Sequence, residues 1–376
     1  QIKRMPGEIR LVFQLARVLG DLGSKDEAIS LLTRTAKRFS HDPGVQGEVA
    51  DLLVRLKAPR KTVLARFQRL RRLEPRDPSH IEALGAYLYG QHQLDDARRV
   101  WNDLLSVTKN SANGHLRLAT ILQDHHFSEH AEEHFLKALE LAPEDIDVLG
   151  AIARWHEDAH KPERALTLWM KIVDLDPDVT DETTRTAIER LVELHADAGR
   201  LSKLIKTLRH GDHDATTPSL ARSVLLILST ARTGALDQAL SEGEKRVSQL
   251  AHPRVLLETM LRIARSSGRH SVVLKLIAQL IDIDPNGSSA LAMERAEILM
   301  RLERLSEARV LTEKILGRTP DDPDILVRIA NLQEEMGDIR RATAILQRAQ
   351  SLHPNTMSVA FRLADLYRRL GEIESE

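Results

Sequence analysis

Three alanines, Ala97, Ala131 and Ala165, lie 34 residues apart, and each falls near the start of a predicted helix. Repetition at a fixed period of roughly 20 to 50 residues is typical of solenoids, in which each repeat buries its apolar face only against its neighbours. Length alone would suggest several globular domains, whereas the period predicts one extended all-α array of stacked helix pairs.

One repeat carries the pattern most clearly. Its first helix reads His115-Leu116-Arg117-Leu118-Ala119, its second runs from Ala131 to Ala138, and Pro143 closes it because proline cannot continue a helix. The pattern resembles the tetratricopeptide repeat family, in which small residues let two helices approach closely and large residues fill the space between them. The resemblance implies a right-handed superhelical α-solenoid of antiparallel helix pairs. Laid along the whole chain, the family pattern gives about ten repeats and a final first helix.

The repeats divide the sequence into three segments. Residues 1–177 hold repeats one to five, and residues 219–376 hold repeats seven to ten with the first helix of an eleventh. Residues 178–218 form a degenerate sixth repeat, in which the step from Ala165 to Leu204 is 39 residues instead of 34. Because polar and Pro/Gly-rich stretches mark loops and boundaries, we expect a hinge in this segment.

The composition agrees with a soluble helical array. Hydrophobic residues make up 42% of the chain, charged residues 29% and aromatic residues 3%, without the sustained alternation that predicts strands. No apolar run approaches the roughly 18 residues that cross a bilayer. The sequence contains no cysteine, which excludes disulfides and thiol nucleophiles and fits either a reducing or an oxidising compartment.

The sequence starts without methionine and stops halfway through a repeat. Terminal repeats need a polar capping face for solubility, so we expect this sequence to be a fragment of a longer protein. Its localisation stays open between a bacterial cytoplasm and periplasm, since the fragment carries no information about a signal peptide elsewhere.

Charge is unevenly distributed although the net charge is −1. Residues 1–75 carry 16 Lys or Arg against 8 Asp or Glu, whereas residues 76–180 carry 10 against 19. Residues 181–376 are balanced, with 28 of each sign. Neighbouring surfaces of opposite sign bias which partners approach each of them.

The resemblance also implies a partner groove, because members of the family bind partners on a concave surface lined by the first helices. The residues at the groove positions are Glu82, Tyr89, Thr120, Gln123, Asp124, Arg154, Glu157, Asp158, Glu258, Arg262, Arg265, Asn331, Glu334, Glu335, Phe361, Asp365 and Arg368. Asp124, Glu157 and Asp158 make the groove of repeats four and five acidic. We therefore expect a protein partner there, in the form of a basic or amphipathic peptide segment or helix.

Two sets of histidines could hold a metal. His156-Glu157-Asp158-Ala159-His160 spells H-E-x-x-H, in which two histidines one helical turn apart bind zinc and the glutamate acts as general base. The repeat pattern argues against this interpretation, because His156 takes a core position and His160 falls at the turn. His126, His130 and His134 are weaker metal candidates, and solvated histidines are the alternative.

A basic helix in repeat two is a further candidate site. Its cationic residues are Arg60, Lys61, Arg66, Arg69, Arg72 and Arg76. Such a row of cations could bind nucleic acid or another anionic polymer. Aromatic residues that stack bases are nearly absent around it, so a solvated helix face is the alternative.

These patterns favour a non-catalytic protein–protein interaction scaffold without a cofactor. Leu/Ala/Arg-rich arrays of this length resemble those of bacterial scaffolds for complex assembly, envelope assembly or polysaccharide export. Two alternatives are nucleic-acid or anionic-polymer binding by the basic N-terminal repeats, and zinc-dependent hydrolysis at residues 156–160.

Overall fold

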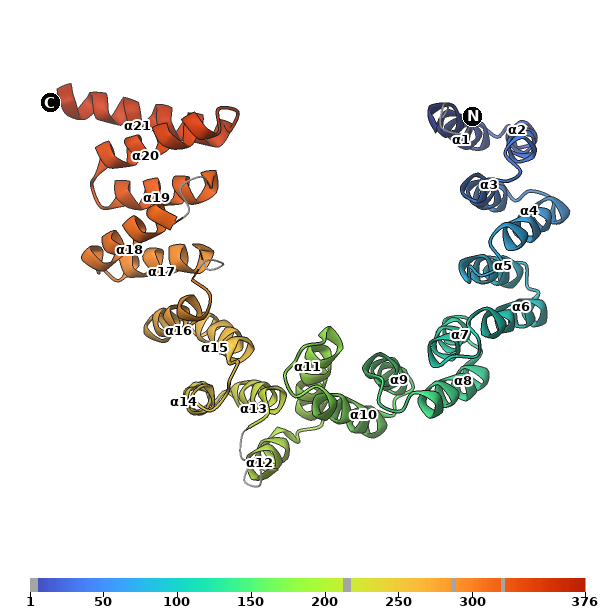
Figure 1. The fold of residues 1–376 in the computed structure, drawn as a ribbon, viewed down its shortest axis with the longest axis horizontal. Coiled ribbons are helices and arrows are strands. Elements are labelled where there is room, and N and C mark those ends of the chain that lie inside the picture. Colours follow the sequence, from blue (N-terminus) through green and yellow to red (C-terminus); the bar gives the residue numbers. More distant parts are fainter. Residues whose placement is uncertain (1–5, 212–217, 286–288, 319–321, 376) are drawn as a thin grey trace. The chain divides into compact units, whose positions relative to one another are not determined.

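The computed structural model describes residues 6–211, 218–285, 289–318 and 322–375, which form 21 α-helices and no strand (Figure 1). The chain divides into two compact bodies, an N-terminal body of Gln1–Leu168 and a C-terminal body of Trp169–Glu376. The hinge expected within residues 178–218 remains a prediction, and residues 212–217 of that segment lie outside the described residues.

The helices of the N-terminal body are α1 (Pro6–Asp21), α2 (Lys25–Arg38), α3 (Pro43–Arg55), α4 (Arg60–Leu73), α5 (Ser79–Gly90), α6 (Leu94–Val107), α7 (Ala112–Asp124), α8 (Ser128–Leu141) and α9 (Ile146–Asp158). The boundary between the bodies falls inside α10 (Pro162–Leu175). The C-terminal body continues with α11 (Glu182–Asp197), α12 (Leu201–Gly211), α13 (Leu220–Arg232), α14 (Leu236–Val247), α15 (Arg254–Ser266), α16 (His270–Ile283), α17 (Ser289–Arg301), α18 (Leu305–Arg318), α19 (Pro323–Glu335), α20 (Ile339–Leu352) and α21 (Met357–Ser375).

Odd-numbered helices are the first helices of the repeats and even-numbered helices are the second. The two helices of a repeat pack against each other, for example α5 with α6, α7 with α8 and α19 with α20. First helices also contact the next first helix, for example α11 with α13 and α17 with α19. In the N-terminal body, α1, α3, α5 and α7 form one layer and α2, α4, α6 and α8 the other (Figure 1). The predicted all-α solenoid architecture is confirmed in each body. None of the described helices is long and apolar enough to span a membrane.

The 34-residue period corresponds to the packing between paired helices. Ala97, Ala131 and Ala165 are each fully buried. The next large residue on each of these second helices is also buried, Trp101 and Trp169 completely and Phe135 to 2% exposure. Small and large side chains therefore alternate along the second helix as the sequence predicts, because close helix approach and a filled interior are both required.

Gly85 on α5 faces the largest of these buried side chains. A Cβ atom added at Gly85 would overlap the indole ring of Trp101. The ring cannot easily move, because it is fully buried and its Nε1 donates a hydrogen bond to the Glu82 carbonyl oxygen at 3.2 Å. Glycine at this position thus allows α5 and α6 to pack around a tryptophan.

Side-chain caps start several of the first helices. Asp42, Asp145 and Asp322 accept hydrogen bonds from backbone N–H groups in the first turns of α3, α9 and α19, at 3.0 to 3.2 Å. Such caps satisfy N–H groups that have no partner within the helix. Pro43 and Pro323 follow two of these caps, where a missing N–H costs little.

The turn inside each repeat contains one residue in the left-handed backbone region. These residues are Gly23, Lys57, His92, His126, His160, Gly199, Gly234, Gly268, Glu303 and Gly337, with φ between +55° and +86°. At His126, the N–H donates to the Gln123 carbonyl at 2.9 Å, and the next N–H, of Phe127, donates to the Leu122 carbonyl at 2.8 Å. This pair of bonds defines a Schellman motif, which ends a helix with a left-handed residue. Half of the turns use a residue with a side chain in a conformation that favours glycine.

We expect Gly85→Ala to lower the free energy of unfolding of the N-terminal body by about 1–3 kcal/mol, because the added methyl group overpacks the site against Trp101. Gly90→Ala is the matched control, since it lies on the same helix with no atom within 4 Å of an added Cβ. Urea unfolding of both variants measures the difference. Equal stability of the two variants would contradict the packing argument.

Two substitutions at equivalent turns should have opposite effects. Gly268→Ala should destabilise the C-terminal body by about 1 kcal/mol, and Glu303→Gly should stabilise it. The reason is that a residue with a Cβ atom adopts the left-handed φ at a higher energy than glycine does. Gly317→Ala, in α18 and with open space around an added Cβ, controls for a change of helical glycine. Thermal unfolding reads out all three. A destabilising Glu303→Gly would show that the glutamate side chain matters more than the turn.

Candidate binding cleft

A cleft of about 420 Å³ lies across three first helices of the C-terminal body, α11, α13 and α15. Its apolar lining residues are Val179, Ile188, Val224, Leu228 and Val255, and its charged ones are Arg185, Glu189, Glu258, Arg262 and Arg265. Glu258, Arg262 and Arg265 are three of the groove residues expected from the sequence. Arg185 and Glu189 were not expected, because α11 belongs to the degenerate sixth repeat. The cleft therefore joins an apolar floor to a mixed-charge rim.

The rim charges are partly compensated by exposed ion pairs. Arg262 Nη1 lies 3.6 Å from Glu189 Oε1, so this pair connects α15 to α11 across α13. Arg254 Nε donates to Glu258 Oε1 at 2.9 Å along α15. Exposed ion pairs of this kind contribute little stability on their own. Their charged groups can therefore exchange these contacts for those of a bound partner at small cost.

Val179, at one wall of the cleft, has an unusual backbone. Its φ is +55° although it is β-branched, and its side chain is 2% exposed. Asp176 holds this turn, because its carboxylate accepts hydrogen bonds from Thr180 Oγ1 at 3.0 Å and from the Asp181 N–H at 2.9 Å. Burial raises the pKa of Asp176, but these hydrogen bonds outweigh it and bring the pKa below its ordinary value. A β-branched residue at positive φ is a genuine outlier, and such strain concentrates at functional sites.

A ladder of polar contacts joins successive first helices along the rest of the C-terminal body. The contacts join Arg265 to Glu294, Glu297 to Arg328 and Asn331 to Arg362, with N···O distances of 2.8, 2.9 and 3.0 Å. Arg328 and Arg362 are 34 residues apart, as are Glu297 and Asn331, so two steps of the ladder repeat the sequence period. Two expected groove residues, Arg265 and Asn331, thus contact the neighbouring repeat.

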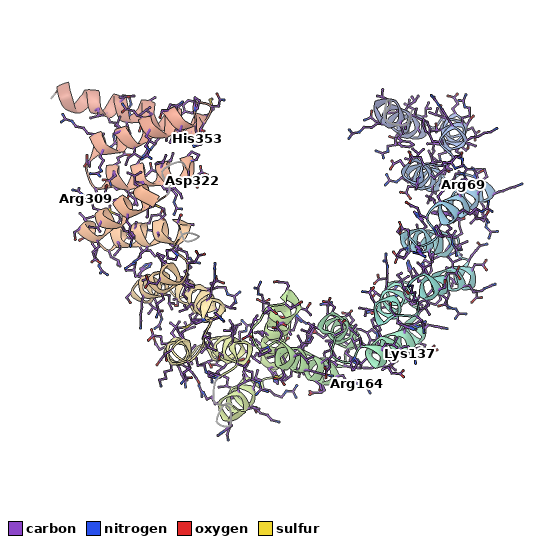
Figure 2. All side chains as sticks on the ribbon, in the orientation of Figure 1. Arg69, Lys137, Arg164, Arg309, Asp322 and His353 are labelled. Carbon is purple, nitrogen blue, oxygen red and sulfur yellow. The ribbon has the colours of Figure 1, made fainter. Side chains whose placement is uncertain are left out.

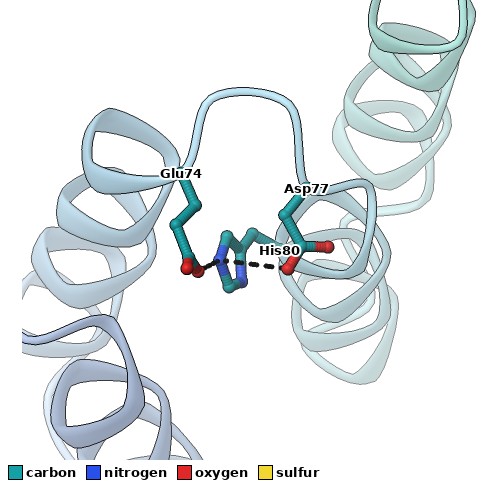
Figure 3. A group of neighbouring side chains, drawn as sticks. All are labelled: Glu74, Asp77 and His80. Carbon is teal, nitrogen blue, oxygen red and sulfur yellow. Dashed lines mark hydrogen bonds and ion pairs between the residues drawn. The ribbon is translucent and has the colours of Figure 1, made fainter.

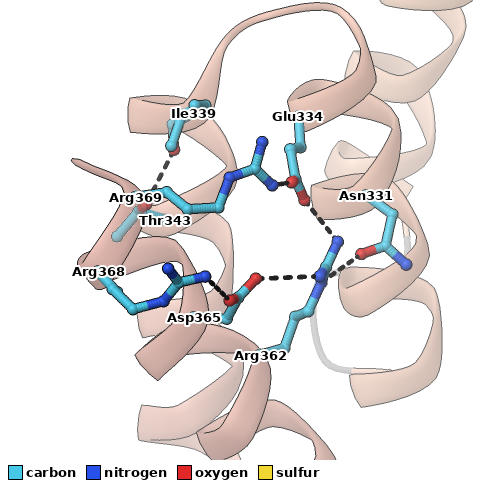
Figure 4. Close-up of polar contacts among 8 residues, drawn as sticks. All are labelled: Asn331, Glu334, Ile339, Thr343, Arg362, Asp365, Arg368 and Arg369. Carbon is cyan, nitrogen blue, oxygen red and sulfur yellow. Dashed lines mark hydrogen bonds and ion pairs between the residues drawn. The ribbon is translucent and has the colours of Figure 1, made fainter. Parts of the chain in front are cut away.

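The last step of the ladder is a small network between α19 and α21 (Figure 4). Arg362 Nη2 lies 2.5 Å from Glu334 Oε2, and Arg369 pairs with the other oxygen of the same carboxylate. Arg368 Nη2 donates to Asp365 Oδ1 at 3.1 Å. The structure therefore brings the expected residues Glu334, Asp365 and Arg368 together, with Arg362 and Arg369 as partners that the repeat pattern did not identify.

In the N-terminal body the expected groove residues divide between core and surface. Tyr89 packs against His125 and lies 4.4 Å away between ring centroids, and His125 stacks on Trp101 at 4.6 Å. Glu82 pairs with Arg117, and Gln123 Nε2 donates to Asp158 Oδ2 at 3.1 Å. Glu157 is half-buried, whereas Thr120, Asp124, Arg154 and, in the C-terminal body, Glu335 and Phe361 are exposed.

The histidines proposed as metal ligands occupy separate environments. His126 and His160 are left-handed turn residues, so His160 lies beyond the end of α9 and not one turn along the helix from His156. His130 Nε2 accepts a hydrogen bond from Arg98 Nη1 at 2.6 Å. None of these histidines belongs to the group of three close ligand-type side chains that the described residues contain.

That group consists of Glu74, Asp77 and His80 in and after the loop between α4 and α5 (Figure 3). His80 Nε2 lies 2.8 Å from Glu74 Oε2 and 3.8 Å from Asp77 Oδ2. Asp77 Oδ1 also accepts a hydrogen bond from the Ser79 N–H at 2.9 Å. Hydrogen bonds from Ser79 lower the pKa of Asp77, and the nearby His80 and Arg117 lower it further. The contacts connect two successive repeats. Glu74, Asp77 and His80 follow one another at intervals of three residues, and this spacing is the feature by which the sequence could have indicated the group.

The basic residues of α4 do not form one continuous stripe. Arg66 Nη1 donates to Gln46 Oε1 at 3.3 Å, and Arg69 Nε donates to the Ser40 carbonyl oxygen at 2.8 Å. Figure 2 labels Arg69 on α4 among the described side chains. Arg60, Lys61, Arg72 and Arg76 are exposed. Two of the six predicted cations therefore contact the preceding repeat, and the other four are exposed, with Arg60 also donating to Gln93.

His115, which is buried, and His134, which is half-buried, form a pair between α7 and α8. Their Nδ1 atoms are 3.0 Å apart, and His115 Nε2 lies 2.8 Å from Asn110 Oδ1. Because Asn110 Oδ1 only accepts, His115 carries its proton on Nε2, and His134 donates to it from Nδ1. Burial lowers the pKa of both imidazoles, and the neighbouring His115 lowers the pKa of His134 further.

Comparison with known proteins identifies one segment by a family model. Residues 324–356, which contain most of α19 and all of α20, match the model of the tetratricopeptide repeat. This is the segment in which the sequence pattern places the tenth repeat.

Two curated proteins are similar over much of the chain. Tetratricopeptide repeat protein 7A of Homo sapiens is 22% identical over 83% of this chain and 32% of its own length. Cellulose synthase 2 operon protein C of Komagataeibacter xylinus is 23% identical over 67% of this chain and 18% of its own length. The chain thus spans a third or less of these relatives. Among solved structures, YrrB, described as a TPR protein with an unusual peptide-binding site, is 14% identical over 61% of this chain and 96% of that chain, with a TM-score of 0.33.

Acidification should destabilise the N-terminal body through three histidines that are buried or half-buried. The pKa values of His115, His134 and His156 are lowered by burial, so the unfolded chain binds more protons than the folded one below the ordinary value of 6.5. The contribution of these histidines to the free energy of unfolding is fully present above that pH. It is lost as the pH falls through their lowered pKa values. Thermal unfolding between pH 7.5 and 5 measures how steeply stability depends on pH. We expect His134→Gln to make this dependence shallower. A slope unchanged by His134→Gln would contradict the role of the pair.

Proposed function

From the premise that this chain belongs to the tetratricopeptide repeat family, we propose that it is a protein-interaction scaffold that binds partner segments in the cleft of α11, α13 and α15. The observation that carries the proposal is the apolar floor bordered by Arg185, Glu189 and Arg262 across three first helices. Extended surfaces of this kind follow from stacked repeats, and members of the family bind protein partners.

The chemistry of the cleft suits an amphipathic partner segment. Apolar side chains of the partner would cover the partly exposed Leu228 and Val255, which removes apolar surface from water. Charged side chains beside them would meet the rim, where Arg262 and Glu189 offer both signs. Burial of apolar anchors supplies affinity, and rim charges supply orientation and specificity.

A stretch of the N-terminal body has a different charge preference. Asp124 and Asp158 are exposed on α7 and α9, and Glu157 is half-buried beside them. This acidic stretch favours a basic or amphipathic peptide segment through charge complementarity. Binding of this kind forms no covalent bond, so we propose that the array acts without catalysis.

The similarity to cellulose synthase 2 operon protein C favours a bacterial setting in envelope assembly or polysaccharide export. The Leu/Ala/Arg-rich composition of the array is consistent with this narrower role. If the role is correct, the partners should be recovered from a bacterial envelope fraction.

Affinity capture from such a fraction at low and high salt tests the scaffold function. Wild-type chain should retain defined proteins at high salt, and Leu228→Glu should reduce their recovery by about tenfold because a charge enters the apolar floor. Leu302→Glu, at an exposed leucine outside the cleft, is the matched control and should retain them. The double variant Glu157→Lys, Asp158→Lys, captured in the same way, tests separately whether the acidic stretch binds a partner. Unchanged capture by Leu228→Glu, or recovery of nucleic acid alone, would contradict the proposal.

A further inference from the structure

A second cleft, of about 870 Å³, lies between α3, α4 and α5 in the N-terminal body. Three cationic side chains line it, those of Arg55, Lys57 and Arg60, against one carboxylate, that of Asp51. It lies in the part of the sequence with the largest excess of positive charge, residues 1–75. The sequence pattern missed it because repeat two is degenerate.

The cations of this cleft are available to a ligand. Among the residues that the structure describes, neither Arg55 nor Lys57 forms an ion pair, and both are exposed. Arg60 Nη2 donates to a neutral partner, Gln93 Oε1, at 2.8 Å. Lys57 also occupies a left-handed turn position, with φ of +55°, where glycine would cost less. Most other arginines that form a side-chain contact in the described part of the chain contact a carboxylate, so the positive charge of this cluster is less neutralised.

The floor of the cleft is apolar. The rings of Phe67 and Tyr87 lie 6.0 Å apart between centroids, and their residues are 3% and 9% exposed. Ala83 and Ala86 on α5 are exposed, and their small side chains leave the cleft open above these rings. Because the aromatic faces are covered, they offer no platform on which bases could stack. The cleft therefore suits carboxylates flanking an apolar side chain better than a nucleic acid.

We propose that the cleft between α3 and α5 binds an acidic segment of a partner protein. Carboxylates of the segment form charge-assisted hydrogen bonds with Arg55, Lys57 and Arg60, and an apolar side chain between them covers the floor at Ala86. The inference rests on the proposed scaffold function and deepens it, because it assigns an acidic partner to repeats two and three. The acidic stretch on α7 and α9 selects the opposite charge, so the N-terminal body distinguishes two kinds of segment.

Fluorescence anisotropy with a labelled peptide of alternating glutamate and leucine tests the proposal. The peptide should bind the full chain, and its glutamine counterpart should bind about tenfold more weakly or worse. Replacing Arg55→Ser together with Lys57→Ser should weaken binding by about tenfold. The matched control is Lys61→Ser with Arg72→Ser, which removes the same charge from exposed positions of α4 that do not line the cleft. This control should stay within about twofold of the wild type.

A second pair of variants distinguishes a loss of binding from a loss of folding. Ala86→Glu places a repelling charge in the cleft and should abolish binding, whereas Ala86→Gln should preserve it, and circular dichroism should be the same for both. Equal weakening by the cleft and control variants, absence of peptide binding, or tighter binding of poly(dT) than of the peptide would each overturn the inference. If capture through the α11–α13–α15 cleft persists in those cases, the scaffold function stands and only the acidic-segment site falls.

Discussion

Close approach of two helices inside each repeat is the constraint on which the rest of the structure depends. It requires a small residue wherever the helices cross and a large buried residue beside it, as in Gly85 with Trp101 and in Ala131 with Phe135. A pair built in this way still exposes an apolar face, which only the next repeat can cover. Stacking of repeats is therefore a consequence of the packing inside each one.

Polar side chains then connect one repeat to the next. The contacts of Arg265, Glu297 and Asn331 with the following first helix recur along the C-terminal body. Arg265 also lines the α11–α13–α15 cleft, so this residue takes part in both the cleft and the inter-repeat contacts. A clustered, exposed set of ion pairs can rearrange when a partner binds, since each pair alone contributes little to stability.

Much of the fold could be predicted because its determinants are local. The spacing of Ala97, Ala131 and Ala165 predicted the helix pairing, and all three are buried. The expected groove residues Glu258, Arg262 and Arg265 line the cleft, and their role in binding stays a prediction. Arg185 and Lys57 were missed because repeats six and two have lost the pattern that assigns groove positions. The Arg362 network was missed because contacts between repeats depend on the rotation from one to the next, which a period does not specify. His160 was expected at the turn because the repeat pattern places it there, and its left-handed backbone agrees with that position.

Hydrogen exchange of the chain with and without a captured partner tests the central claim most directly. Exchange slows where binding stabilises the backbone hydrogen bonds of the elements that form a site. The scaffold account predicts protection in α11, α13 and α15 on partner binding, with the second helices α12, α14 and α16 little changed. Protection confined to the second helices would contradict it.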